Sequence, residues 1–537
     1  MRLLSIAFCL VALAHGQQAA KTSEDLCTLP PSSRPPLLPA RLLPGQGLSH
    51  LTITTKSPEA QKFFDQGLAQ MHNFASYEAE RSFLQAAQLD PESAMPQWGI
   101  AMVAAGDYRP TFQLRDGGAR RTPSPGPRTP APGLERARAA AEKARKLSDP
   151  ATPLEKLYIA AVVARRNAEA KDAEAGYLQA LRDLLRAYPK EVEAKSFLAL
   201  GLMSGYEPPD KKPRPGTEES YALLQEILAQ DPDHVGAHHY VIHALEGSTH
   251  PQDAWASCKR YPELSPGVPH ALHMPGHIYV QSDRWMDAAS SFEAAARKER
   301  ELLAADQLYP NQHHGHNVHF MVTTYSFLGQ YEEAMKNSGE LLEFRENPRE
   351  AKQASNTRTP YRQGWFARMR TLVQFGKWDE ILDGKLLPEY PAARERAWRH
   401  WVRGLAFAAR GDAAQARAEA KSMDEQMKAW DKVSGSPAPQ LEVARLELSG
   451  HVEMAAGHKR KGLDLLERAA TRELALPYNE PAAYPRPVWE AMGQAALGAR
   501  DRKRAETAFR RALEQNPGSS RARLGLGATA AVGGGGE

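Results

Sequence analysis

The sequence predicts an all-α protein built from stacked helix pairs, and three observations support this fold class. Residues that favour helices, such as Ala, Leu, Arg, Glu and Gln, dominate the 537 positions of the chain. β-branched residues are sparse, which argues against large sheets. A pattern of small, aromatic and proline residues also recurs at a fixed spacing. We therefore expect a superhelix in which each helix pair buries its apolar face against its neighbours.

The recurring pattern is complete near both ends of the chain. Separations of 12, 4, 3 and 5 residues are shared by two sets, Gly67, Ala79, Phe83, Ala86 and Pro91, and Gly493, Ala505, Phe509, Ala512 and Pro517. In a tetratricopeptide repeat (TPR), small residues let two helices approach, and the proline ends the second helix. Looser matches lie between them, at Tyr279, Trp285, Ala288 and Phe292, at Tyr325, Gly329, Tyr331 and Ala334, at Gly376 and Trp378, and at Gly411 and Ala416. The pattern predicts a TPR-type α-α superhelix, or solenoid, of roughly eight to ten helix pairs.

The N-terminus has the features of a secretory signal peptide, which we place at residues 1–16. Arg2 supplies a positive charge, and an apolar stretch from Leu3 to Ala14 follows it. The small residues Ala14 and Gly16 suit cleavage after Gly16. Because no later segment has about 18 unbroken apolar residues, stable membrane insertion is not expected. The sequence thus predicts an exported protein, either periplasmic or secreted.

Composition divides the rest of the chain into six segments. They are a Pro-rich leader (17–50), an N-terminal TPR unit (51–108), a low-complexity Pro-rich loop (109–134), central TPR repeats (135–355), C-terminal TPR repeats (356–530) and a Gly-rich tail (531–537). Residues 206–217 are expected to form a further irregular connection. After signal cleavage Cys27 and Cys258 remain, and they could pair in an oxidising compartment or stay unpaired.

The charge balance gives no reason to expect nucleic acid as a partner. The chain has 68 basic and 64 acidic side chains, a formal net charge of +4, and no long basic run. Its unusual feature is a set of 18 histidines, which concentrate in three segments of the central repeats.

Two of these segments repeat at the TPR period. His239 and His243 are four residues apart, so they share a helical face with Glu246, three residues further on. His273 and His277 follow 34 residues later with the same mutual spacing. We therefore expect the two pairs on equivalent first helices of successive repeats.

The third segment contains His316 and His319. Alignment of Tyr325 with Tyr279 places His319 at the position of His273, with His316 one turn earlier. In TPR proteins generally such positions point into the concave groove, which the resemblance implies here. Because neighbouring helices pack about 8–10 Å apart, the imidazoles could converge on one point.

Histidines arranged in this way suit a metal site. Three or four neutral imidazoles in fixed geometry, with a carboxylate, are typical ligands of zinc, copper, iron or manganese. The predicted ligands are His239, His243, Glu246, His273, His277, His316 and His319. Glu246 is also the candidate general base. Two other interpretations stay open, namely a histidine-lined groove that binds a peptide and a purely structural network.

Five other histidines are weaker candidates, because they flank the predicted helices or lie near the N-terminus. They are His270, His313, His314, His50 and His72. The last two would join the site only if the superhelix curls far enough. Pro275 is expected to start a helix and so to place His273 near its capping turn. The loop Asn479-Glu480-Pro481 is expected to serve packing, with capping of the groove as the alternative.

Several motifs together resemble a family of exported bacterial TPR proteins with a His-x-x-His-Met-Pro-x-His motif. They are Phe64-Asp65-Gln66-Gly67, Ala94-Met95 with Trp98-Gly99, His273-Met274-Pro275-Gly276-His277 preceded by His270, and His316-Asn317. The resemblance covers most of residues 50–530 and implies the repeat fold, but adds little mechanism. The chain departs from the family pattern at Asp107-Tyr108-Arg109 and at His72-Asn73-Phe74.

These features predict a protein that binds a protein or peptide partner in a concave, histidine-lined groove with an embedded divalent transition metal. The alternative is a metal-dependent enzyme, a hydrolase or oxidoreductase, with the same residues on the inner face. A metal carrier or sensor is a third hypothesis. The H-E-x-x-H, G-x-S-x-G and P-loop motifs are absent, which weakens the enzyme hypothesis without removing it. The sequence leaves the metal, the partner and the oligomeric state open.

Overall fold

The computed structural model describes residues 39–116, 132–306, 309–346, 351–353 and 356–531. Within these ranges the chain consists of helices and connecting segments, apart from one short hairpin. The all-α prediction is therefore confirmed. The predicted signal peptide, most of the Pro-rich leader, Cys27, the middle of the Pro-rich loop and most of the Gly-rich tail lie outside the described residues.

Successive helices pack against each other as pairs, and the described residues contain eleven of them. In chain order the pairs are α2 (Pro58–His72) with α3 (Ser76–Leu89), α4 (Met95–Val103) with α6 (Pro132–Lys146), α7 (Pro153–Arg166) with α8 (Ala173–Ala187), α9 (Val192–Leu202) with α10 (Thr217–Gln230), α11 (Val235–Leu245) with α12 (Trp255–Leu264), α13 (Pro269–Gln281) with α14 (Trp285–Ala305), α15 (Gln312–Phe327) with α16 (Tyr331–Leu342), α18 (Pro360–Gln374) with α19 (Trp378–Asp383), α20 (Ala393–Ala409) with α21 (Ala413–Ser434), α22 (Pro439–Ala455) with α23 (Lys459–Leu474), and α24 (Val488–Gly498) with α25 (Arg502–Gln515). The last helix, α26 (Ser520–Ala531), packs on α25.

The repeated glycine and phenylalanine positions form the contact inside a pair, as the spacing predicts. A Cβ atom added to Gly67 would lie 2.7 Å from the Phe83 ring, and one added to Gly493 would lie 2.6 Å from the Phe509 ring. Gly276 of α13 stands in the same relation to Phe292 of α14, at 2.4 Å. Each glycine is thus needed because the facing ring fills the space that a side chain would take.

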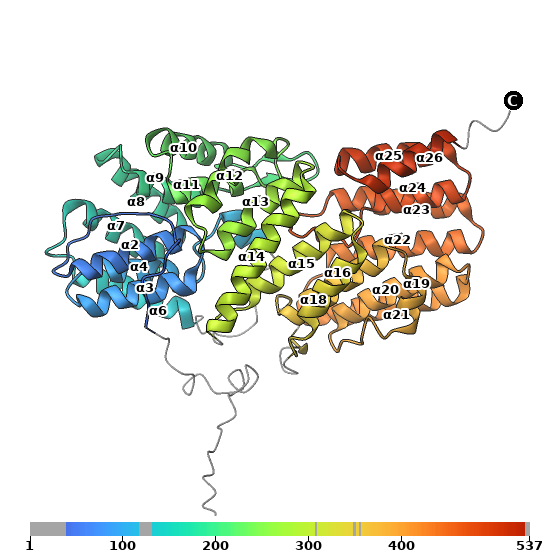
Figure 1. The fold of residues 1–537 in the computed structure, drawn as a ribbon, viewed down its shortest axis with the longest axis horizontal. Helices are drawn as coiled ribbons and strands as arrows, with labels where there is room; N and C mark the ends of the chain where they lie inside the picture. The colour runs from blue at the N-terminus through green and yellow to red at the C-terminus, as the bar shows by residue number, and fades with distance from the viewer. Residues whose placement is uncertain (1–38, 117–131, 307–308, 347–350, 354–355, 532–537) are drawn as a thin grey trace, which may run out of the picture.

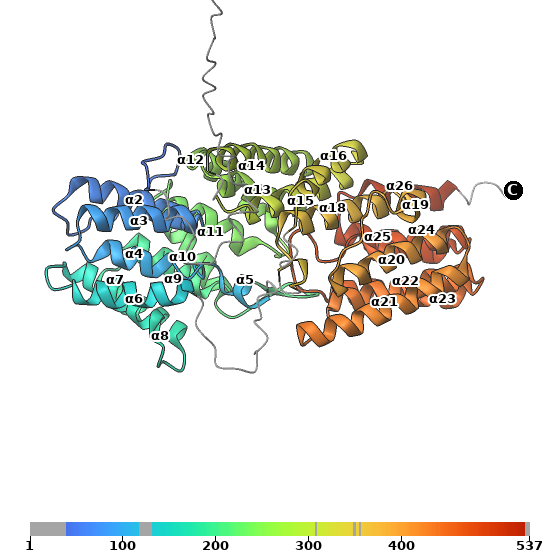
Figure 2. The same cartoon turned by 90° about the horizontal axis from the view of Figure 1, so that it is seen from below.

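The stacked pairs form two groups of helices joined by a central segment (Figures 1 and 2). One apolar core runs from Leu51 to Ile278, a second from Ala288 to Ala367, and a third from Ala351 to Ala522. Helices α13 to α16 and α18 lie between the N-terminal helices, blue to green, and the C-terminal helices, orange to red (Figure 1). No helix of the described residues is both long enough and apolar enough to span a bilayer.

The segment between α23 and α24 reaches back to the central helices. Gln281 at the end of α13 donates a hydrogen bond to the Tyr478 hydroxyl at 2.8 Å and another to Glu480 Oε1 at 3.1 Å. Arg370 of α18 donates to the carbonyl oxygen of Tyr484 at 3.0 Å. Residues about 200 positions apart in the sequence are therefore brought together here.

Three local expectations differ from the structure. Residues 206–217 include a two-stranded hairpin, β1 (Tyr206–Glu207) with β2 (Lys212–Pro213), in a segment expected to be irregular. A short helix, α5 (Thr111–Asp116), lies within the expected Pro-rich loop. Pro275 lies inside α13, because that helix already begins at Pro269, a proline suited to the first turn.

Candidate metal centre

Two groups of three histidines lie between the N-terminal and central cores. The first centre is His239, His243 and His270, and the second centre is His273, His277 and His316. In each centre one ligand-capable atom from every residue lies within 4.8 Å of the others. His239 and His273 are fully buried, whereas the third member of each centre, His270 and His316, is half-buried.

The two centres are related by the repeat. The first centre takes two histidines, four residues apart, from α11 and its third from α13. The second centre takes two, again four residues apart, from α13 and its third from α15. The paired histidines recur after 34 residues, from His239 to His273. The third recurs after 46 residues, from His270 to His316, which equals the step from Tyr279 to Tyr325. The second centre is therefore a structural copy of the first.

In the first centre each ring is held through its Nδ1 atom. His239 Nδ1 lies 2.5 Å from the carbonyl oxygen of His72, and His243 Nδ1 lies 2.9 Å from Glu246 Oε2. His270 Nδ1 lies 3.0 Å from His313 Nε2. The opposite Nε2 atoms of His239 and His270 are 3.0 Å apart, and the buried Nε2 of His243 has no hydrogen-bond partner among the described residues.

In the second centre the two rings of α13 are held in the same way. His273 Nδ1 lies 2.7 Å from the side-chain oxygen of Asn317. His277 Nδ1 lies 2.6 Å from Glu246 Oε1 and 2.5 Å from Glu480 Oε2. The Nε2 atoms of His273 and His277 face each other at 2.6 Å.

This orientation is the one that a metal ion requires. A ring that donates its Nδ1 proton to an oxygen keeps a lone pair on Nε2. At Nε2–Nε2 distances of 2.6–3.0 Å, a proton or a metal ion must lie between the two nitrogens, and a metal ion would replace the proton that one ring donates to the other. Imidazole nitrogens bound to tetrahedral zinc at about 2.0–2.1 Å are about 3.3 Å apart, so the His239 and His270 rings would separate slightly and the His273 and His277 rings by about 0.7 Å to hold an ion. Outer oxygen partners that fix each ring are also typical of metal-binding histidines.

Burial keeps most of these rings neutral, as ligands must be. Burial, followed by the charge of neighbouring histidines, holds the pKa values of His239, His270, His273 and His316 well below the usual range. For His277 burial acts in the same direction, but the carboxylates of Glu480 and Glu246 raise its pKa to about 10. A metal at the second centre would therefore displace a proton from His277.

Glu246 is shared by the two centres. Its two carboxylate oxygens accept from His243 and His277, one in each centre. Burial raises the pKa of this carboxyl group, but the two imidazoles outweigh burial and lower it to about 2. Glu246 therefore acts first as an outer partner that orients ligands. It can also group with His277 and Glu480, an alternative that competes with the second centre for His277.

His319, predicted as a ligand, does not join a centre. It has the position equivalent to His273, but its Nδ1 lies 2.5 Å from Gln363 Oε1 of α18, and its Nε2 is buried without a hydrogen-bond partner among the described residues. Thr323, four residues later, stands where a second histidine would be required. The series of centres ends at α15 because the next repeat lacks imidazoles.

The two N-terminal histidines also stay outside the centres. His50 is exposed and pairs with Asp65 at 2.8 Å. His72 is buried, and its ring lies against the Tyr240 hydroxyl and the carboxylate of Glu193. Only the main-chain carbonyl of His72 reaches the first centre. The superhelix thus brings this turn close, but not as a source of a ligand ring.

Sequence reasoning undervalued His270 and missed several outer partners. His270 is a ring of the first centre, and its step of 46 residues to His316 was the available signal. His313, treated as a weak candidate, connects His270 to the buried carboxylate of Glu299. Glu480 comes from the loop expected to serve packing, and its carboxylate instead reaches His277.

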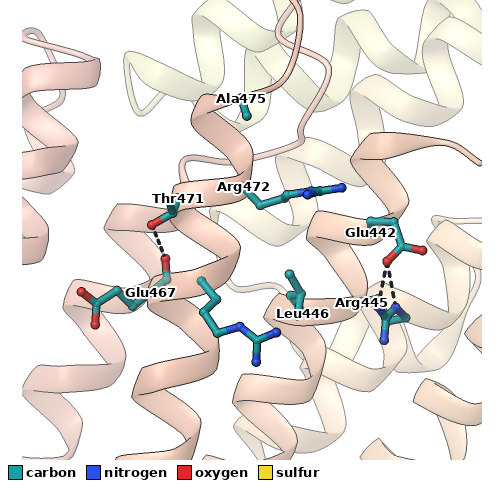
Figure 3. Close-up of a pocket in the computed structure, with 8 residues that line it drawn as sticks. Glu442, Arg445, Leu446, Glu467, Thr471, Arg472 and Ala475 are labelled. Atoms are coloured by element: carbon teal, nitrogen blue, oxygen red, sulfur yellow. Dashed lines mark hydrogen bonds and ion pairs between the residues drawn. The ribbon is translucent and has the colours of Figure 1, made fainter. Parts of the chain in front are cut away.

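Two other features of the structure lie apart from the centres. His72, Glu193 and His234 form a further buried group, in which the carboxylate lies between two imidazoles. A cavity of about 620 Å³ lies over α22 and α23 (Figure 3). Its lining includes Glu442, Arg445 and Arg472, and no predicted site residue.

Comparison with known proteins does not assign the chain to a family. No protein-family model and no curated protein matches the chain, so the resemblance to exported bacterial TPR proteins stays a prediction. Among solved structures, the APC/C hetero-tetramer Cut9-Hcn1 matches with a TM-score of 0.29 at 11% identity, covering 88% of this chain and 90% of the other. Yeast Tom70 matches with a TM-score of 0.28 at 10% identity, covering 89% of each chain. The TPR domain of P58(IPK) matches with a TM-score of 0.23 at 13% identity, covering 88% and 98%. These scores are too low to add to the assignment, and it is the helix pairs themselves that make the chain a TPR-type superhelix.

Proposed function

We propose that this protein binds transition-metal ions at two adjacent three-histidine centres. The observation that carries the proposal is the orientation of the rings. In both centres Nδ1 atoms are held by outer partners, while Nε2 atoms converge and in one case remain buried without a partner. A purely structural network would be expected to satisfy the buried Nε2 of His243 as well.

The donor set narrows the choice of metal. Nitrogen-only ligands suit zinc, copper and iron, whereas manganese favours oxygen. Three protein ligands leave a coordination position open, which is characteristic of catalytic rather than structural zinc sites. Of the four metals that the sequence suggests, zinc, copper and iron therefore fit best.

The open position favours a metal-dependent enzyme as a second candidate function. A metal with a free position can activate water or hold a substrate atom. Burial raises the pKa of Glu480 to about 7, so this carboxyl group is better placed than Glu246 to accept and release protons. The choice between hydrolase and oxidoreductase depends on which metal binds.

Binding of a protein or peptide is a separate proposal, supported by the repeat fold alone. His239, His243 and His273 would not contact such a partner directly, since they are buried, whereas the half-buried His270 and His316 could. Export likewise rests on the features of residues 1–16 alone.

Elemental analysis of the untagged protein, purified without chelators, tests the metal proposal. We expect about two metal ions per chain, lost in the double variant His243→Ala, His277→Ala, which removes one ligand from each centre. The matched control is His50→Ala, His458→Ala, because both residues are exposed histidines paired with carboxylates. Absence of bound metal after challenge with zinc, copper, iron and manganese would overturn the proposal.

A further inference from the structure

Arg109 lies beside the first centre, on the segment between α4 and α5. Its guanidinium carbon is 5.1 Å from the centroid of the Phe74 ring. The same ring is 4.4 Å from the His239 ring and 5.3 Å from the His243 ring, measured between centroids. It is also 5.7 Å from His270. One aromatic side chain therefore joins Arg109 to all three rings of the first centre.

This arginine has no counter-ion among the described residues. The other arginines facing the same segment do have one, since Arg165 and Arg166 both pair with Asp107. Burial, followed by the charge of Arg358, lowers the pKa of Arg109 to about 10. Arg109 thus stays charged at neutral pH in partly buried surroundings, an arrangement that costs free energy until an anion arrives.

The positive charge of a metal-bound first centre would also favour an anion beside Arg109. Divalent metal ions would add positive charge, while the nearby carboxylates of Glu246 and Glu299 are already engaged by histidines. Arg358 adds to the positive field, since its charge acts on His316 as well as on Arg109. The surroundings of the first centre therefore favour an incoming anion.

We propose that Arg109 binds an oxyanion, a carboxylate or phosphate group, beside the first centre. The planar guanidinium fork matches the paired oxygens of either group. The inference names the substrate class of the proposed metal site and so rests on the proposed function. The simpler role, stacking on Phe74 alone, needs no anion and predicts that no anion is bound.

Calorimetric titration of sodium acetate and of inorganic phosphate into the zinc-loaded protein, at matched ionic strength, tests this. The wild type is expected to bind one or both, and the two titrations show which oxyanion is preferred. Arg109→Gln is expected to bind about tenfold or more weakly, since a charge-assisted pair is lost. Arg109→Lys should fall between them. Arg284→Gln is the control, because Arg284 also stacks on an aromatic ring but already has Asp287 as its partner.

Two further measurements distinguish the metal proposal from the inference about Arg109. They are the zinc content of each variant and the change in melting temperature that oxyanions cause in the metal-free protein. Unchanged zinc content in Arg109→Gln with lost anion binding supports the inference. Equal anion binding by the wild type and Arg109→Gln, or none by the wild type, overturns it. If the wild type takes up none of zinc, copper, iron and manganese, the metal proposal fails. The inference about Arg109 is then decided by whether oxyanions raise the melting temperature of the wild type but not of Arg109→Gln.

Discussion

At the residue scale, Glu246 shows how one buried carboxylate can order two sets of ligands. It lies just after α11, and its two oxygens hold His243 of that helix and His277 of the next first helix. Because each ring can turn only if this bond breaks, the carboxylate fixes which nitrogen faces the centre. The residue belongs to neither centre alone.

Replacement of Glu246 should therefore weaken metal binding at both centres together. In Glu246→Gln we expect metal affinity to fall about 10–100-fold at each centre, the usual effect of losing an outer carboxylate. Competition with a chelator of known affinity measures this. Glu453→Gln, which alters a half-buried carboxylate bound to the exposed His458, is the control. Loss at one centre only would show that the two centres are independently oriented.

Glu473 makes stability depend on pH. Burial raises the pKa of this carboxyl group to about 8, although Val488 N–H and the Gln515 side chain donate to it. Since its pKa in the unfolded chain is near 4.5, the folded state holds the extra proton, and stability falls as pH rises from about 4.5 to 8. Glu473→Gln removes this loss and offers a donor to the unpartnered Gln515 Oε1.

We expect Glu473→Gln to be more stable than the wild type at pH 9 by about 1–3 kcal/mol, and nearly equal to it at pH 5. Urea titrations at the two pH values measure the difference. Glu467→Gln, an exposed change on the same helix, should show no such dependence. A constant difference at both pH values would contradict the raised pKa.

At the element scale, the helix pair depends on close approach at a single glycine. In α24, Gly493 faces the Phe509 ring of α25, whereas Gly498 of the same helix faces open space. The same type of substitution therefore has opposite expected effects at two positions five residues apart.

Gly493→Ala should destabilise the C-terminal repeats by about 1–3 kcal/mol, because the added methyl overlaps a buried ring. Gly498→Ala should be neutral or stabilising by up to about 1 kcal/mol, because alanine favours helix over glycine. Thermal unfolding followed by circular dichroism compares the two. Equal effects would mean that the ring moves aside and that the contact does not set the helix spacing.

At the scale of the whole molecule, the second centre joins distant parts of the chain. Glu480, from the segment between α23 and α24, contacts His277 of α13, and Tyr478 contacts Gln281. Near the C-terminus Arg521 donates to the Ser326 carbonyl of α15. Metal binding at α13 is therefore expected to stabilise the contact between the second centre and the segment that leads into the C-terminal helices.

We expect zinc at 100 times its dissociation constant to stabilise the folded chain by about 2.7 kcal/mol for each occupied centre. Hydrogen exchange should slow in α11, α13, α15 and residues 475–487, but not in α21. The double variant His243→Ala, His277→Ala should show neither effect. Zinc-dependent protection of α11 and α13 without protection of α15 would indicate that only the first centre is filled.

The sequence by itself determined the helical fold and the paired histidines. Helix propensity and the recurring glycine, alanine and phenylalanine positions act over one helix pair, so spacing alone specifies the contacts of Gly67 with Phe83 and of Gly493 with Phe509. The pairs at His239 and His273 follow for the same reason, since residues four apart share a helical face.

The packing of successive repeats determines which rings complete each centre. The third ring comes from the next repeat, so it depends on how successive first helices stack, and this selected His270 and His316 while leaving His319 against Gln363. Glu480 and Arg109 approach from loops that no periodicity places. In a solenoid each repeat contacts its neighbours, so local spacing determines those contacts. Contacts between segments far apart in the sequence depend instead on the curvature of the whole superhelix.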